Sequence, residues 1–169
     1  MEISAKSIIL FGAVVLTGLS AGLFLAWSIS IIPGTKRVID ATYLETMQSI
    51  NRAILNPVFF TIFFGSVILL SLASIYQLHN SKWTFGLMLA SSIIYLIGTI
   101  GVTGLGNVPL NNQLDTLNLS EQSVHMIREF RKYYEINWNQ LHQIRTVAAL
   151  ISFMLAIIAL LVQVGNLEG

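Results

Sequence analysis

The sequence predicts an all-α protein: a four-helix transmembrane bundle built as a single domain over residues 1–169. Hydrophobic residues make up 54% of the chain and charged residues only 10%, with a mean hydropathy of +0.73, which is typical of proteins that fold in lipid. Four apolar runs each reach the roughly 20 residues that a helix needs to cross a bilayer. The polar segments between them are too short to form a second domain with its own core.

The four expected spans are bounded by residues that begin or end helices. Pro33-Gly34 should end the first span, and Asn56 should cap the second, with Pro57 as its first helical residue. Gly106-Asn107-Val108-Pro109 should end the third, because glycine followed by proline is a stop signal. The first apolar run exceeds the roughly 7 to 15 residues of a secretory signal, so we expect a retained helix. The predicted spans are residues 7–32, 57–78, 83–105 and 138–164.

Two further helices are expected in the longer connections. Residues 40–55 are too polar to span the bilayer, but Tyr43 and Met47 begin an apolar stripe at helical spacing. This pattern predicts an amphipathic helix at the membrane interface. Residues 120–134 are expected to form a surface helix with Ser120 as its N-cap.

Four spans place both termini on one side of the membrane and the two longer connections on the other. The nine basic residues are distributed unequally, with seven of them on the side of the long connections. The positive-inside rule therefore predicts that these connections face the cytoplasm, in a plasma or inner membrane. The net charge of +1 provides no field that would attract nucleic acid. The seven are Lys36, Arg37, Arg52, Arg128, Arg131, Lys132 and Arg145.

The start of the fourth span carries the most informative pattern. Spacings of i, i+4, i+7 and i+11 place on one helix face Trp138, His142, Arg145 and Ala149. An arginine at the membrane boundary is costly to bury alone, so it should face the bundle interior with a partner. Two interpretations stay open. Arg145 either snorkels to headgroups or pairs with Asp40 or Glu45, or it anchors an anionic or oxygen-bearing ligand.

His142 has the chemistry of an acid or a base near neutral pH, because the unperturbed pKa of an imidazole is about 6.5. The alternative is a histidine that is simply hydrogen-bonded inside the bundle. His125 is expected on the same membrane side as His142, so the two could share a metal or haem. No ligand spacing supports such a site, and no cofactor is predicted. The chain has no cysteine, which excludes thiolate ligands and disulfides.

Polar and aromatic residues from other segments are expected at the membrane face that carries Arg145. Each asparagine has an ordinary explanation as a helix cap or loop residue, but their coincidence with the Arg145 stripe predicts a polar pocket just inside the interface. Trp27 and Ser28 near the end of the first span are expected to line the same pocket. The asparagines are Asn51, Asn56, Asn107 and Asn111.

Several short motifs occur in order along nearly the whole chain. They are Trp27-Ser28 with Pro33-Gly34, Met47-Gln48-Ser49-Ile50-Asn51-Arg52 with Asn56-Pro57, Gly106-Asn107-Val108-Pro109-Leu110-Asn111, and Trp138 with Arg145-Thr146. Together they resemble the anthrone-oxygenase-like (DUF1772) family of four-span membrane proteins. The resemblance implies a chemistry related to that of the fungal members, which are associated with oxidising anthrones to anthraquinones with dioxygen.

The first functional hypothesis is a membrane-embedded, cofactor-independent oxygenase or oxidoreductase whose apolar anthrone-like or quinone-like substrate enters from the lipid. In this hypothesis Arg145 stabilises an oxyanion, His142 takes a proton and Asn107 orients oxygens. Aromatic side chains would stack on the substrate rings. The predicted substrate-binding residues are Trp27, Ser28, Asn51, Asn56, Asn111 and Trp138.

Two other functions are compatible with the same features. The pocket could bind or transport a small amphipathic molecule without chemistry, although the chain shows neither the repeats nor the broken helices of transporters. The polar face could instead dock another subunit, or a second copy of the chain in a homo-oligomer. The expected partners are therefore the lipid bilayer and a small apolar or amphipathic molecule, with no nucleic acid.

Overall fold

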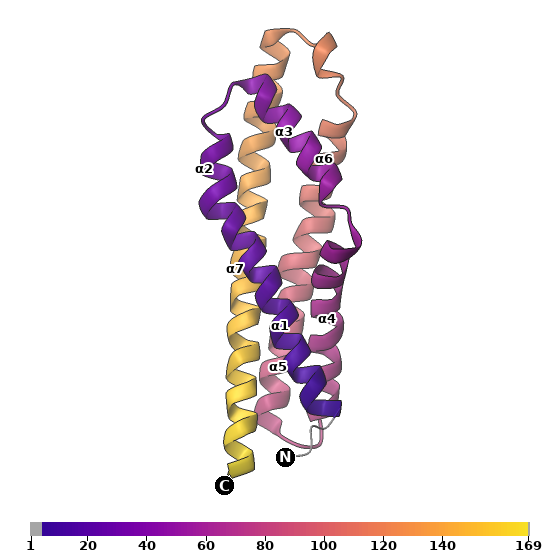
Figure 1. Cartoon of the computed structure of the whole chain (residues 1–169), viewed down its shortest axis with the longest axis vertical. Coiled ribbons are helices and arrows are strands. Elements are labelled where there is room, and N and C mark those ends of the chain that lie inside the picture. The colour runs from indigo at the N-terminus through magenta and orange to yellow at the C-terminus, as the bar shows by residue number, and fades with distance from the viewer. Residues whose placement is uncertain (1–4, 169) are drawn as a thin grey trace.

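The structure, a computed structural model, describes the backbone of residues 5–168 and the side chains of residues 5–165. Within this part of the chain every regular element is helical, and four long apolar helices pack together. Figure 1 shows that the start of the first helix and the end of the last lie at the same end of the bundle. The predicted all-α bundle is confirmed, and the four candidate spans make the chain an integral membrane protein.

The first long helix passes through the position where the sequence predicts its end. It consists of α1 (Ala5–Ala26), the π-helical segment η1 (Trp27–Ile31) and α2 (Ile32–Thr35), and is continuous over 31 residues. A proline inside a helix lacks one N–H and crowds the carbonyl of the preceding turn. The π turn directly before Pro33 has a different hydrogen-bond pattern, so the chain accommodates the proline without ending the helix.

Helix α3 (Asp40–Ala53) is amphipathic as predicted, but its apolar face packs on protein. Tyr43 and Met47 are buried in a cluster that includes Tyr134 of the last helix. Figure 1 shows α3 lying across the upper part of the bundle. Burial, ahead of the charge of Glu135, raises the pKa of Tyr43 well above its usual value. Its neutral ring therefore packs beneath the guanidinium of Arg131, 4.6 Å away.

Helix α4 (Pro57–Gln77) defines the level of the membrane. Asn56 caps it as predicted, because its Oδ1 accepts a hydrogen bond from Phe59 N at 3.0 Å. At 21 residues the helix is about 31 Å long, which matches the roughly 30 Å hydrocarbon core of a bilayer. From this match in length we infer that the N-terminal end of α4 lies at one boundary of the hydrocarbon core.

The third long helix continues beyond its predicted end at Pro109. It is continuous over 34 residues and consists of α5 (Lys82–Ile94), η2 (Tyr95–Gly101), η3 (Thr103–Asn107) and α6 (Val108–Asp115). Both η segments are π-helical, and Pro109 lies in the first turn of α6, where its missing N–H matters least. The expected stop at Gly106–Pro109 was wrong for this reason.

Helix α7 (Val124–Glu168) joins two predicted elements into one, because the surface helix expected at 120–134 and the fourth span at 138–164 are continuous. No glycine or proline lies between them. Ser123 caps the helix, accepting from Met126 N at 3.2 Å, whereas Ser120 belongs to the short 3₁₀ turn η4 (Leu119–Glu121). At 45 residues α7 is about 67 Å long, so one part of it extends beyond the membrane.

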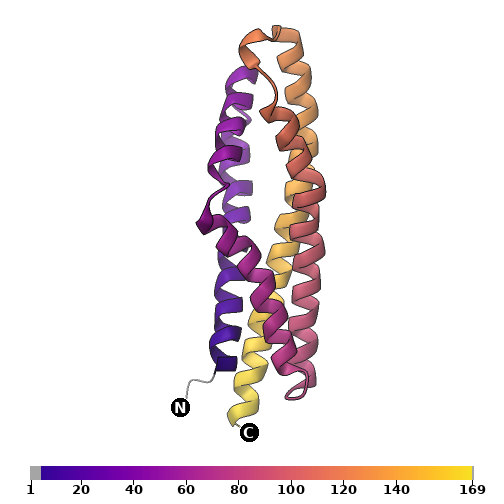
Figure 2. The ribbon, with the colours of Figure 1, turned by 90° about the vertical axis from the view of Figure 1, so that its right-hand side faces the viewer.

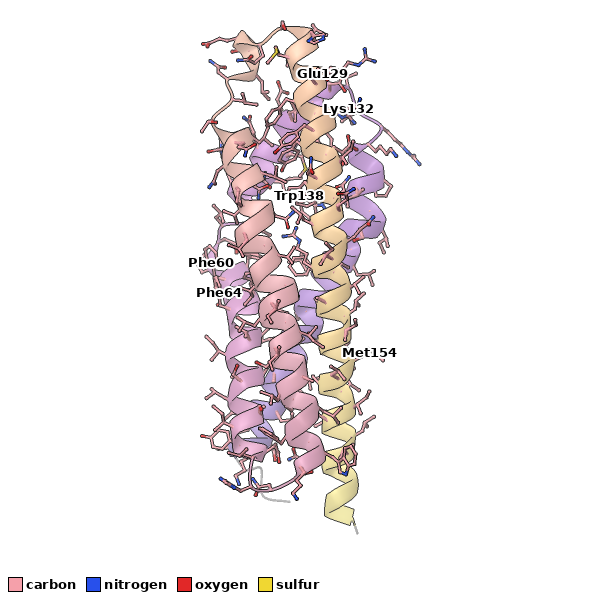
Figure 3. All side chains as sticks on the ribbon, turned by 180° about the vertical axis from the view of Figure 1, so that it is seen from behind. Phe60, Phe64, Glu129, Lys132, Trp138 and Met154 are labelled. Carbon is pink, nitrogen blue, oxygen red and sulfur yellow. The ribbon has the colours of Figure 1, made fainter. Side chains whose placement is uncertain are left out.

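Two hydrophobic clusters are stacked along the bundle. The lower cluster fills the space between the four spans and includes Phe24 and Phe63. The upper cluster lies between α3, α6 and α7 and includes Tyr134 and Trp138. In Figure 3, Glu129 lies at the upper end of α7, above Trp138, while outward-pointing apolar side chains of α4 lie below Trp138. Figure 2 shows that the helical ribbon is interrupted between α3 and α4 part of the way along the bundle.

Two helices approach each other closely where Gly98 faces Ala148. A Cβ atom added at Gly98 would lie 2.5 Å from the Cβ of Ala148. Such contacts bring backbones together and strengthen packing in a membrane, where lipid removes most of the hydrophobic driving force between helices. The contact joins η2 to α7 close to the arginine stripe.

Candidate functional site

A cavity of about 180 Å³ lies where the two hydrophobic clusters meet. Phe24 and Phe59 line it from the lower side, and Trp27 and Trp138 line it from the upper side. The rings of the two tryptophans lie 5.7 Å apart. Because Phe59 is in the first turn of α4, the cavity lies at the membrane boundary. A polar pocket just inside the interface is what the asparagines and the Arg145 stripe predict.

The arginine stripe of α7 faces the interior, as its spacing predicts. Trp138 is 3% exposed, His142 0%, Arg145 8% and Ala149 0%. Figure 3 shows Trp138 between α7 and the third long helix. Of these four residues, Trp138 and Arg145 line the cavity.

The guanidinium of Arg145 is held by aromatic rings and neutral acceptors. It lies over Phe24 at 4.8 Å and over Trp138 at 5.0 Å from the ring centroids. Its Nε and Nη2 donate to His142 Nδ1 at 3.1 and 3.0 Å, and Nη1 donates to Thr103 Oγ1 at 3.4 Å. These contacts orient the cation toward the cavity without neutralising it.

No carboxylate pairs with Arg145 among the residues that the structure describes. Asp40, which the sequence offered as a partner, instead accepts from Arg131 at 2.9 Å, and Glu45 is exposed. Snorkelling does not apply either, because the side chain is buried. A buried cation without a counter-ion is costly, so the geometry favours an anionic ligand as its partner.

The hydrogen bonds of His142 determine its tautomer. Arginine can only donate, so Nδ1 must be the unprotonated nitrogen. Nε2 then carries the proton, which is consistent with its contact to the carbonyl oxygen of Phe24 at 3.1 Å and to Ser28 Oγ at 3.0 Å. His142 is neutral here and does not line the cavity, and its lone pair is directed at Arg145.

A chain of hydrogen bonds crosses the cavity wall from α3 to α6 and α7. Asn51 Nδ2 donates to the Tyr134 hydroxyl at 3.1 Å, and that hydroxyl donates to Asn111 Oδ1 at 2.9 Å. Trp138 Nε1 donates to the same Asn111 oxygen at 2.8 Å. Asn51, Asn111 and Trp138 all line the cavity, as the sequence analysis expected.

An ion pair lies at the mouth of the cavity. Arg52 Nε contacts Asp115 Oδ1 at 2.6 Å, and both side chains are at least half exposed. Leu55 and Val108, also exposed, line the same opening. The mouth therefore opens at the level of lipid headgroups, with apolar side chains beside a charged pair.

Besides His142, three of the predicted site residues do not line the cavity, which makes four in all. Ser28 hydrogen-bonds His142 and the carbonyl oxygen of Phe24. Asn107 is 1% exposed, donates to Trp138 O at 3.2 Å, and has a buried Oδ1 without a hydrogen-bond partner among the described residues. Asn56 is the cap of α4 and also donates to Ala53 O at 2.9 Å.

The role of Asn56 as a cap leads to a prediction. Replacing Asn56 by alanine is expected to lower the free energy of unfolding by about 1 kcal/mol, because an N–H at the start of α4 loses its acceptor. Ligand affinity should not change, because the side chain does not line the cavity. Thermal unfolding and binding assays on the same preparation test both parts. A loss of affinity at unchanged stability would instead place Asn56 in the binding site.

The structure adds Tyr134 and Thr103 to the predicted residues. Tyr134 lies four residues before Trp138, so extending the α7 stripe by one turn would have included it. Thr103 contacts Arg145 from the π-helical segment η3, and Trp27 begins the π-helical segment η1. Such segments often occur at functional sites, but spacing rules based on regular helices do not predict them.

Among the described residues, no group of three histidine, aspartate or glutamate side chains is arranged to hold a metal ion. His125 and His142 lie on the same helix, 17 positions apart, or about 26 Å along its axis. The two histidines therefore cannot share a metal, contrary to what the sequence left open.

Comparison with known proteins agrees with the resemblance described above. The sequence matches the family model described as anthrone oxygenase over residues 59–155, more than half of the chain. No curated protein and no solved structure matches it. The matched residues include Asn111, Trp138 and Arg145 of the cavity wall. The chain belongs to the anthrone oxygenase family.

Proposed function

We propose that the cavity binds a planar, anthrone-like aromatic molecule as its oxygen anion and promotes its oxidation by dioxygen. One observation carries this proposal: Arg145 is a buried cation that lines an aromatic cavity and has no acidic partner among the described residues. An oxyanion would supply the missing negative charge. The family match is consistent with this chemistry.

The walls of the cavity favour an aromatic ligand. Trp27, Trp138, Phe24 and Phe59 present ring surfaces, on which a planar molecule can stack. The volume of about 180 Å³ lies below the roughly 300 to 1,000 Å³ of sites for drug-sized ligands, which favours a small rigid molecule. The exposed Leu55 at the mouth offers an apolar route from the bilayer.

The proposed reaction balances with the substrate and dioxygen as its only reactants. Loss of a proton from the central CH₂ of an anthrone gives an enolate, whose negative oxygen pairs with Arg145. The electron-rich carbon transfers one electron to dioxygen, and the two radicals combine to form a C–O bond. Protonation gives a hydroperoxide, and loss of water leaves the second carbonyl. One anthrone and one dioxygen thus yield one anthraquinone and one water.

The neighbours of Arg145 have distinct roles in this proposal. When the guanidinium turns toward a bound oxygen, it releases the lone pair of His142 Nδ1, which can then accept the proton. Ser28 holds the opposite ring nitrogen of His142. Asn107 acts through Trp138, to whose carbonyl oxygen it donates, and so positions one wall of the cavity.

A second function, binding or transport without chemistry, is favoured by one observation. Both ring nitrogens of His142 are engaged with protein groups, and the ring does not line the cavity. A pocket that only binds an aromatic anion would need Arg145 and the rings but no proton acceptor. Binding without turnover would support this second function.

An oxygen-uptake assay separates the two functions. Protein in lipid nanodiscs is mixed with anthrone under air, and oxygen consumption and anthraquinone absorbance are followed together, with empty nanodiscs as the measure of autoxidation. An oxygenase should consume oxygen and form quinone in a 1:1 ratio, well above the empty discs. If the protein only binds anthrone, the bound anthrone should quench the tryptophan fluorescence, and oxygen consumption should stay at the rate of the empty discs. If anthrone causes no quenching and oxygen consumption is no faster than with empty discs, both functions are contradicted.

A further inference from the structure

The hydroxyl of Tyr134 is a buried polar group that the proposed reaction does not use. Tyr134 is 0% exposed and lies one turn before Trp138 on α7. Its hydroxyl connects Asn51 of α3 with Asn111 of α6, which are far apart in the sequence. Both amides line the cavity, so this single hydroxyl contacts two polar side chains of the cavity wall.

The direction of every hydrogen bond in this chain follows from Trp138. An indole Nε1 can only donate, so the Asn111 atom that contacts it at 2.8 Å must be the oxygen. The Tyr134 hydroxyl, 2.9 Å from the same oxygen, must then donate its only proton there. It can only accept from Asn51, and the amide atom that faces it must therefore be Nδ2.

This order of donors leaves two amide atoms for a ligand. Asn51 Oδ1 remains as an acceptor, and Asn111 Nδ2 remains as a donor. Neither atom has a protein partner among the residues that the structure describes. The cavity wall thus has a defined polarity, with an acceptor on the α3 side and a donor on the α6 side.

We propose that Tyr134 is a specificity-determining residue that fixes this polarity, so that the cavity prefers an aromatic ligand carrying a hydroxyl group, which donates to Asn51. The inference rests on the proposed function in one respect, because an aromatic molecule must occupy the cavity. It goes further by naming a substituent of the ligand and the residue that selects it. Arg145 selects a ligand oxygen, whereas Tyr134 selects a hydroxyl beside it.

Removal of the Tyr134 hydroxyl should affect the two amides differently. Trp138 Nε1 still holds Asn111 in place. Asn51 loses its only side-chain partner and can rotate by a half turn, so that it presents either its oxygen or its nitrogen to a ligand. The preference for a hydroxyl over an oxygen that can only accept should therefore disappear.

Two matched probes test this inference. The probes 2-hydroxyanthraquinone and 2-methoxyanthraquinone share one ring system but differ in the ability to donate, and unsubstituted anthraquinone serves as the reference. Binding is measured in nanodiscs by tryptophan quenching on a Trp83→Phe background, because the other two tryptophans line the cavity and Trp83 is 80% exposed. Empty nanodiscs correct for partitioning of the probes into lipid.

The wild-type cavity should bind the hydroxy probe about tenfold more tightly than the methoxy probe, since the latter leaves Asn51 Oδ1 unpaired. Tyr134→Phe should reduce this ratio to about twofold or less while the affinity for the unsubstituted quinone stays unchanged. The variant keeps the ring, which stacks on Phe130 at 6.1 Å. Asn51→Ala should lose the same preference and so tests the inference if Tyr134→Phe does not fold.

Each other outcome overturns the inference. A tenfold ratio retained in Tyr134→Phe would show that the hydroxyl does not set the polarity. An equal loss of affinity for all three probes would assign Tyr134 a merely structural role. Binding of the probes by wild type without preference would overturn the inference and leave the proposed function standing. Failure of wild type to bind any probe would overturn both.

Discussion

Replacement of Arg145 by methionine is expected to abolish anthrone-dependent oxygen uptake and to leave the bundle folded and at least as stable as wild type. The guanidinium is buried and has no carboxylate partner among the described residues, so it costs free energy in the absence of a ligand. An apolar side chain of similar length removes that cost. From similar replacements of buried charges, we expect a gain of up to about 1–4 kcal/mol in the free energy of unfolding.

The loss of activity should be large because the charge acts where negative charge develops. Removal of one preorganised donor to an oxyanion typically lowers kcat by about 10²- to 10³-fold. Oxygen uptake and denaturant unfolding are measured on the same preparations. Arg128→Met is the matched control, because Arg128 lies on the same helix but is exposed, and it should change neither quantity. An Arg145→Met variant that kept its activity would remove the main support for the proposed function.

Gly98→Ala is expected to produce the largest loss of stability among glycine-to-alanine changes at the glycines that the structure describes. The new Cβ would lie 2.5 Å from the Cβ of Ala148, and both atoms are attached directly to helix backbones. Neither side chain can move aside, so η2 and α7 must separate. Overpacking of this kind typically costs about 1–3 kcal/mol, and we expect the upper part of that range.

Two variants serve as controls for this experiment. Gly104→Ala, with no atom within 4 Å of the added Cβ, should be neutral or slightly stabilising, since alanine favours helix. The double variant Gly98→Ala with Ala148→Gly moves the methyl group from α7 to η2, so that only one methyl group remains at the contact. This variant should restore most of the stability. Thermal unfolding in detergent compares all four proteins. Equal melting temperatures for Gly98→Ala and Gly104→Ala would contradict the close contact.

Several features of the fold follow from local sequence alone. The length and hydropathy of the four apolar runs predict the spans, because each helix must satisfy its own backbone hydrogen bonds in lipid. Asn56 followed by Pro57 predicts the start of α4, since capping involves only neighbouring residues. The spacing of Trp138, His142 and Arg145 predicts that all three are buried, and they are.

Helix ends were less predictable where tertiary packing overrides a local signal. Pro33 and Pro109 predict that two helices end, yet both helices continue. π-Helical segments precede both prolines and change the hydrogen-bond pattern there, and such segments follow no simple sequence rule. The surface helix and fourth span merge into α7 because no residue between them breaks a helix, although polarity changes sharply.

The sequence by itself determined the class of protein, the number of spans and the buried face of α7, because these depend on hydropathy and on spacing along one helix. Only the tertiary structure decided what that face meets. Arg145 finds rings and a histidine instead of Asp40 or Glu45. Tyr134 bridges Asn51 and Asn111 across three helices. Pairings between distant segments depend on how helices pack, and no periodicity within one segment encodes them.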